Sequence, residues 1–138
     1  MAKRIIAQGA AIDKQRAKIT AVIKALQAED RRLTKLGCHK AYIHFKTGTN
    51  KMFLLEPTDA RGKRKHIYIG VDPKKQQKAR EKVERECQRD QVREHISQLN
   101  NELARLDNEL NHLVWMFESC AKASAHTLKL IKKEMNND

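Results

Sequence analysis

The chain has 138 residues, of which 40% are hydrophobic, 4% aromatic and 33% charged, so it is too apolar for complete disorder and too polar for a thick globular core. Its formal net charge is +12. Repulsion among so many positive side chains destabilises the folded chain, so a surplus of this size favours a polyanionic partner. We expect one domain over residues 1–138, mainly α, whose long helices bury a narrow apolar stripe.

The first predicted element is a helix over residues 2–36. Five of its apolar residues are spaced seven apart: Ile5, Ile12, Ile19, Leu26 and Leu33. A repeat of this length is typical of a coiled coil, and Val22 and Leu36 are expected at the second position of the seam. Gly37 is a suitable residue to end the helix.

Residues 39–70 change from helical to alternating periodicity and predict a small antiparallel β-meander. "KAYIHFK" is the first strand, and "TGTN" at 47–50 is a turn signal. "KMFLLE" is the second strand, which Pro57 ends, and "HIYIG" is the third, which ends at Gly70. A meander this small needs support from the helix ends.

A second helix is predicted over residues 73–117, with Asp72 as its N-cap and Pro73 in its first position. Its heptad residues are Ile96, Leu99, Leu103, Leu106, Leu110, Leu113 and Phe117. Residues 118–135 either continue this helix or form a third, C-terminal helix that folds back. The expected architecture is a long antiparallel, coiled-coil-like helical hairpin with the meander at its bend.

Basic residues gather in the two loops of the meander. Those expected to bind nucleic acid are Arg61, Lys63, Arg64, Lys65, Lys46 and Lys51. Guanidinium and ammonium groups bind phosphate oxygens, and a two-stranded ribbon fits a DNA groove, so we favour DNA over RNA as the partner. An ordinary solvated hairpin loop is the alternative.

Three aromatic residues lie beside these cations: Tyr42, Phe45 and Tyr68. Aromatic faces stack on unpaired bases, which would suit a nucleic-acid interface. Only six aromatic residues occur in the whole chain, however, and the meander needs a core. We therefore favour a place for all three in a small core between the meander and the helix ends.

Histidines and cysteines offer little evidence for catalysis or metal binding. His39, His44 and His66 lie near Cys38 in the sequence, but their spacing matches no standard zinc pattern. One possible function is a nuclease that uses His44 and His66 as acid and base, although no companion carboxylate stands out in the sequence. We expect no enzyme activity, no metal and no cofactor.

The stretch "LVWMF" at 113–117 is apolar on every side of a helix. A 35-residue first helix whose C-terminal end lies opposite Lys74 would cover the second helix only to about residue 108 and leave this stretch uncovered. We expect a homodimer that buries it, with an interface formed by Leu110, Leu113, Trp115, Met116 and Phe117. The alternative is a third helix that folds back and covers this stretch with Leu128 and Ile131.

The three cysteines, Cys38, Cys87 and Cys120, are odd in number and widely spaced, which suggests a reducing cytoplasm rather than a disulfide framework. The N-terminal residues lack the continuous apolar stretch of a secretory signal. No stretch has the length of apolar residues that would span a bilayer, so no membrane partner is expected.

Residues 61–106 resemble small uncharacterised proteins of bacterial mobile elements and phages. In these, a basic β-hairpin that ends in a "Gly-Lys-x-x-x-x-Tyr-Ile-Gly"-like strand leads into a long helix. Gly62, Lys63 and the Tyr68-Ile69-Gly70 run carry the resemblance. It implies a setting in DNA mobility or phage–host conflict and supplies no catalytic residues.

These patterns favour a non-enzymatic nucleic-acid-binding protein that contacts phosphates through a basic β-hairpin head on a helical stalk. The alternative is a protein-interaction or inhibitor module, such as an anti-defence protein, that binds an acidic surface of nucleic-acid-processing machinery. Gel shifts at several salt concentrations separate these two functions.

Overall fold

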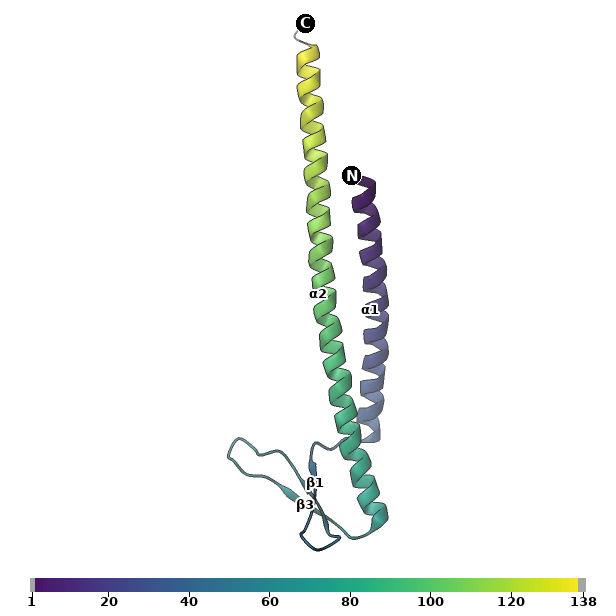
Figure 1. Cartoon of the computed structure of the whole chain (residues 1–138), viewed down its shortest axis with the longest axis vertical. Helices are drawn as coiled ribbons and strands as arrows, with labels where there is room; N and C mark the ends of the chain where they lie inside the picture. Colours follow the sequence, from purple (N-terminus) through teal and green to yellow (C-terminus); the bar gives the residue numbers. More distant parts are fainter. Residues whose placement is uncertain (1, 137–138) are drawn as a thin grey trace. The chain divides into compact units, whose positions relative to one another are not determined.

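The structure, a computed structural model, describes residues 2–136. Its elements are α1 (Ala2–Leu36), β1 (Tyr42–Phe45), β2 (Met52–Leu55), β3 (His66–Gly70) and α2 (Pro73–Met135) (Figure 1). The expected mainly α fold, with three short strands between two long helices, is confirmed.

Both helices begin or end at the residues that the sequence indicates. Gly37 follows α1 with φ = 100°, a conformation that favours glycine, and its N–H donates to the carbonyl of Thr34 at 3.2 Å. At the start of α2, the Asp72 carboxylate accepts a hydrogen bond from the backbone N–H of Lys74 at 3.1 Å. Asp72 is therefore the N-cap, as predicted.

α2 is continuous for 63 residues, so the alternative of a separate third helix is wrong. Residues 118–135 belong to α2 because neither glycine nor proline interrupts the chain between Lys74 and Met135. Neither α1 nor α2, as far as residues 2–136 describe them, contains a segment apolar enough to cross a membrane.

The three strands form one antiparallel sheet in the order β1-β2-β3. Tyr42 pairs with Leu55 across β1 and β2, and Phe53 pairs with Tyr68 across β2 and β3. Because β2 is antiparallel to both neighbours, the β1–β2 turn and the β2–β3 loop lie at opposite ends of the sheet. Ile69 is an extra residue in β3, which produces a bulge beside Met52 and Phe53.

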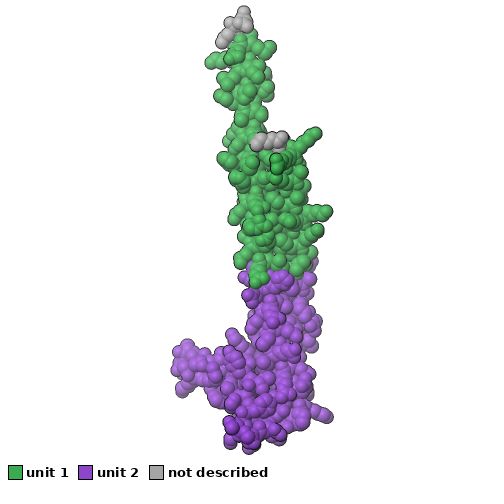
Figure 2. Space-filling model, viewed as in Figure 1, with its two compact units in different colours: residues 1–23, 98–138 green, residues 24–97 purple. Residues whose placement is uncertain are grey.

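The chain divides into two compact units (Figure 2). Unit 1 contains the residues up to Ile23 and those from Gln98 onward, and unit 2 contains Lys24–Ser97. The sheet lies entirely in unit 2, whereas both helices contribute residues to both units.

The core of unit 2 joins the sheet to the first turns of α2. Met52 and Leu54 of β2 are buried against Ala79 of α2. Partly buried neighbours complete this core: Ala41, Ile67, Ile69 and Val83. The small Ala79 side chain lets β2 approach the helix closely, and this contact supports the meander.

Arginines of α2 hold the end of α1 within unit 2. Arg85 Nε donates to the carbonyl oxygen of Gly37 at 2.6 Å, and Arg93 Nε lies 3.1 Å from the Asp30 carboxylate. The carbonyls at the end of a helix lack partners within the helix, and Arg85 Nη2 satisfies one of these acceptors by donating to the Leu36 carbonyl at 3.3 Å.

Apolar residues from both helices form the core of unit 1. Its buried members are Ile5, Ile12, Ile23 and Leu106. Val22 is 44% exposed, so Ile23 takes the seam position that the heptad assigned to Val22. Arg16 Nε lies 2.7 Å from Asp107 Oδ1, an ion pair in which the N–H does not point squarely at the oxygen.

Candidate nucleic-acid interface

The β2–β3 loop is a structured hairpin tip that protrudes from the sheet (Figure 1). Asp59 organises it, because its Oδ1 accepts hydrogen bonds from the backbone N–H groups of Arg61 and Lys63, both at 2.9 Å. The Asp59 N–H donates to the Lys63 carbonyl at 2.7 Å, and Gly62 between them has φ = 78°. These hydrogen bonds hold the backbone of the tip and thereby set the positions from which its basic side chains extend.

All six cations predicted to bind nucleic acid are exposed. Arg61, Lys63, Arg64 and Lys65 lie in the β2–β3 loop, and Lys46 and Lys51 lie in the β1–β2 turn. The structure therefore places them as four at one end of the sheet and two at the other. None of the six forms an ion pair with an acidic residue of the described chain.

The acidic residues near the sheet have structural roles. Glu56 lies 3.0 Å from His39 Nε2, Asp59 holds the hairpin tip and Asp72 caps α2. Unit 2 as a whole has 19 lysines and arginines against 10 aspartates and glutamates, which is +9 of the total charge of +12. The charge surplus is therefore concentrated in the unit that contains the sheet.

One face of the sheet packs on α2, and aromatic rings are arranged on the other. Strand alternation and pairing place Tyr42, Leu55 and His66 in one row of this outer face. His44, Phe53 and Tyr68 form the second row. The side chains on the two edge strands are exposed, and those on the central strand are half-buried.

The prediction that three aromatic residues form the core of the meander is wrong. Tyr42 is 63% exposed, Tyr68 58% and Phe45 38%. The core is aliphatic because Met52 and Leu54 occupy the face above Ala79, and alternation directs Tyr68 to the opposite face. Which face of this short sheet the helix covers depends on a contact between β2 and Ala79, which are distant in the sequence.

Two contacts involve the aromatic rings of the outer face. One joins two of these rings, and the other joins a ring to the basic loop. The Phe53 and Tyr68 rings have centroids 5.1 Å apart at a tilt of 49°. The Arg64 guanidinium carbon lies 5.9 Å from the centroid of the Tyr42 ring. On β1, Phe45 instead contacts Arg80 of α2, at 5.8 Å from its ring centroid.

A basic cleft lies between the sheet and α2, and the sequence analysis missed it. The cleft is about 440 Å³ in volume, and Lys75, Lys78 and Lys82 line it together with Ile67 and Ile69. The signal was present in the sequence, since lysines at i, i+3 and i+7 share one face of a helix. Their proximity to β3 required the structure.

His44 and His66, the two histidines considered as acid and base, are not neighbours in the sheet. His44 and His66 lie on the two edge strands with β2 between them, about 10 Å apart across the sheet by standard strand spacing. The Cys38 thiol donates to the Leu33 carbonyl at 3.3 Å. Within residues 2–136, no group of three or more His, Cys, Asp or Glu side chains could hold a metal ion.

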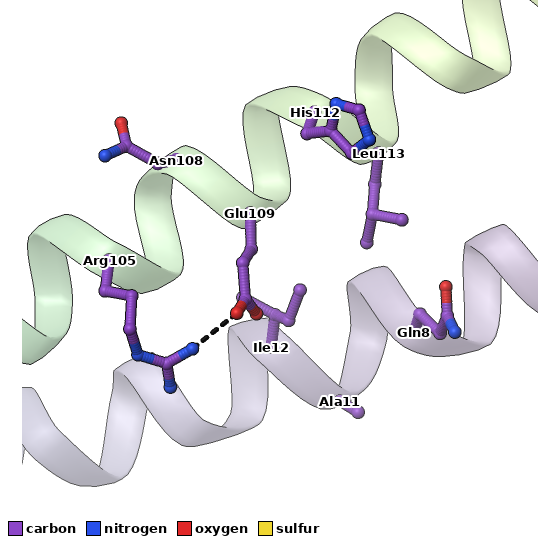
Figure 3. Close-up of a pocket in the computed structure, with 8 residues that line it drawn as sticks. All are labelled: Gln8, Ala11, Ile12, Arg105, Asn108, Glu109, His112 and Leu113. Atoms are coloured by element: carbon purple, nitrogen blue, oxygen red, sulfur yellow. Dashed lines mark hydrogen bonds and ion pairs between the residues drawn. The ribbon is translucent and has the colours of Figure 1, made fainter.

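Unit 1 contains an open groove of about 620 Å³, with Ile12 and Leu113 among its lining residues (Figure 3). Arg105 is its cation, but this side chain bonds to Glu102 and Glu109. The hydrogen bond from Arg105 lowers the pKa of Glu102 below its usual value, so both partners stay charged at neutral pH. This groove therefore has no uncompensated positive charge to offer a phosphate.

The residues expected at a dimer interface divide into two groups. Leu110, Leu113 and Met116 are half-buried, and Trp115 and Phe117 are 62% and 42% exposed. A Leu110 methyl lies 3.9 Å from the Cβ position of Gly9, so α1 covers α2 beyond residue 108, where we expected the coverage to stop. The expected offset was wrong because the end of α1 contacts Arg85 rather than Lys74.

Comparisons of this chain with protein-family models, with curated proteins and with solved structures found no significant match.

Proposed function

We propose that this chain is a non-enzymatic nucleic-acid-binding protein that contacts phosphates through the β-meander of unit 2. The observation that carries the proposal is the set of six exposed cations without acidic partners, at both ends of the sheet. Lysine and arginine side chains that face solvent release counterions from nucleic acid when they neutralise its phosphates, which provides most of the affinity of such proteins.

The helices serve as the support in this proposal, paired as an antiparallel, coiled-coil-like hairpin. Contacts in unit 1 join Gly9 to Leu110 and Arg16 to Asp107. Those in unit 2 join Asp30 to Arg93 and Gly37 to Arg85. Within each unit, residue numbers rise along α1 as they fall along α2, which supports an antiparallel arrangement.

Binding to duplex DNA over a series of salt concentrations tests the function. Contact with about four to six phosphates should give a slope of roughly −4 to −5 in log K against log salt concentration. A slope near zero, or no binding of either duplex or single-stranded DNA at low salt, would contradict the proposal.

A pair of charge-matched variants locates the binding face. Exchanging four residues of the hairpin tip for glutamine removes four charges from unit 2: Arg61, Lys63, Arg64 and Lys65. The control removes four exposed charges from α1 in unit 1: Lys3, Arg4, Lys14 and Lys18. The tip variant should lower affinity and flatten the slope, whereas the control should change both much less. Equal losses would show that only total charge matters.

The second candidate is a protein-interaction or inhibitor module that meets an acidic protein surface. Exposed apolar side chains along α2 in unit 1 favour it, since these suit a protein partner or a second copy of the chain. A homodimer, a cytoplasmic location and an origin in a phage or mobile element remain predictions. Identifying what co-purifies with the chain, nucleic acid or one defined protein, separates the two functions.

A further inference from the structure

We propose that the outer face of the sheet binds single-stranded nucleic acid by stacking unpaired bases on its aromatic rows. This inference rests on the proposed nucleic-acid function and specifies its ligand. A duplex hides the faces of its bases within the helix, whereas a single strand offers them to aromatic side chains.

The chemistry of the outer face supports this ligand. Tyr42, His44, His66 and Tyr68 are exposed on the edge strands, and half-buried Phe53 lies between His44 and Tyr68 on β2. An isolated exposed aromatic residue on a surface is ordinary, but five planar rings on one side of a three-stranded sheet form a platform. Every base has a π face, so such a platform accepts single strands of varied sequence.

The position of the cations explains why the occupant is a nucleic acid rather than an apolar peptide. Lys46 and Lys51 lie at one end of the sheet and the hairpin tip at the other, so the aromatic rows lie between two sources of positive charge. The rows themselves are about 6.6 Å apart along the strands. A nucleic-acid strand that runs along the direction of β2 could place its phosphates at both ends of the sheet and its bases on the aromatic rows.

The contact between Arg64 and Tyr42 shows that the Tyr42 ring is accessible to a planar group. A guanidinium carbon 5.9 Å from the ring centroid is within the range of a cation–π contact. The same arginine can also bind a phosphate, because its N–H donors lie in the plane of the guanidinium and point outward from its edge. One side chain thereby links the charged loop to the stacking surface.

Fluorescence anisotropy with three labelled ligands of equal length tests the inference. The ligands are a twelve-nucleotide oligo(dT), an abasic strand with the same number of phosphates, and a twelve-base-pair duplex. Oligo(dT) should bind about 10-fold or more tightly than the abasic strand, because stacking adds to the phosphate contacts. An oligo(dU) and oligo(rU) pair then shows which sugar the face prefers, and the inference holds with either.

The decisive variant is Tyr42→Leu/Tyr68→Leu, which removes two rings and no charge. It should lower oligo(dT) affinity about 10-fold and leave abasic affinity unchanged. Phe45→Leu is the matched control, since Phe45 lies on β1 but contacts Arg80 of α2 rather than sharing the outer face. Circular dichroism should show that all variants keep their helices.

Failure of the inference is distinguishable from failure of the proposed function. Equal affinity for oligo(dT) and the abasic strand, with a steep salt dependence for both, would overturn stacking and leave phosphate binding intact. A duplex that binds more tightly than oligo(dT) would also overturn it. Absence of binding to all three ligands at low salt would overturn both.

Discussion

The guanidinium carbon of Arg64 lies 5.9 Å from the centroid of the Tyr42 ring, although 22 positions separate the two residues in the sequence. Arg64 belongs to the basic β2–β3 loop and Tyr42 begins the first strand. Their contact brings a cation to the outer face of the sheet. The charged loop and the aromatic rows are therefore neighbouring parts of one surface in unit 2.

A double-mutant cycle measures this contact. Arg64→Ala and Tyr42→Leu should show a coupling of about 0.5–1 kcal/mol in the free energy of unfolding, as expected for an exposed cation–π pair. Urea denaturation of the parent, the two single variants and the double variant provides the value. A second cycle between Arg64 and Phe117, which lie in different units, is the control and should show no coupling. Additive effects in the first cycle would mean that the contact contributes nothing in solution.

The basic cleft between β3 and α2 provides a second prediction. Replacing Lys75, Lys78 and Lys82 with glutamine should weaken nucleic-acid binding and reduce the salt slope by up to about 2 to 3, if each lysine neutralises one phosphate. The measurement is anisotropy over the same salt series.

The matched control for the cleft is a variant with three exposed lysines of the later part of α2 exchanged for glutamine: Lys122, Lys129 and Lys132. It removes the same charge from unit 1. If both triple variants change the slope alike, the cleft makes no specific contribution.

Local signals were sufficient to predict the elements of this fold, except that they left open whether residues 118–135 continue α2. Gly37 ends α1, and Asp72 with Pro73 begins α2, because each residue type satisfies a particular backbone requirement. The turn at residues 47–50 and the loop that contains Gly62 separate the strands for the same reason. Patterns that act within a few residues can be read without the fold.

Contacts between distant segments could not be read in this way. The heptad did not reveal that the end of α1 contacts Arg85 rather than Lys74, because the path of the meander sets that offset. The exposure of Tyr68 depends on which face of the sheet packs over Ala79. The six cations could be assigned to the two loops from the sequence, and the order β1-β2-β3 confirms that these loops lie at opposite ends of the sheet.

Burial of Leu106 makes it the best position to test the core of unit 1. Its side chain is 1% exposed, so Leu106→Ala removes apolar contacts and leaves a cavity. The expected loss is about 2–5 kcal/mol in the free energy of unfolding, measured in urea. Val22→Ala, at a side chain that is 44% exposed, is the control and should change stability by less than about 0.5 kcal/mol. An unchanged midpoint for Leu106→Ala would show that this seam is not buried in solution.

The N-cap of α2 lies at the junction between the sheet and the helix, because only Val71 separates Asp72 from the end of β3. Asp72→Ala should cost about 0.5–2 kcal/mol, since the N–H of Lys74 loses its acceptor. Asp72→Asn keeps a side-chain oxygen and should recover most of this loss. Asp90→Ala, an exposed change in the helix interior, removes the same charge as a control. A loss in the Asp90 variant equal to that of Asp72→Ala would attribute the effect to charge rather than capping.

Exposed apolar side chains in the later part of α2 predict self-association. They are Val114, Trp115, Phe117, Leu128, Leu130, Ile131 and Met135. Since residues 118–135 continue α2, no folded-back third helix covers them. Burial of one large apolar side chain contributes about 1.5–3 kcal/mol, so several together suffice to hold two copies of the chain. A symmetric dimer buries the same patch twice and would also present two basic sheets to a long polyanion.

Light scattering over a concentration series measures this association. The parent chain should exceed its monomer mass of 16.0 kDa as concentration rises, and Trp115→Gln should shift the transition to higher concentration. Trp115 is the best position because its ring is 62% exposed and stacks only on His112, at 5.9 Å between ring centroids, among the aromatic contacts of the described chain. Tyr68→Gln, which removes an exposed ring from unit 2, is the control and should associate like the parent. A mass of 16.0 kDa at every concentration would remove the homodimer and leave these side chains for a different partner.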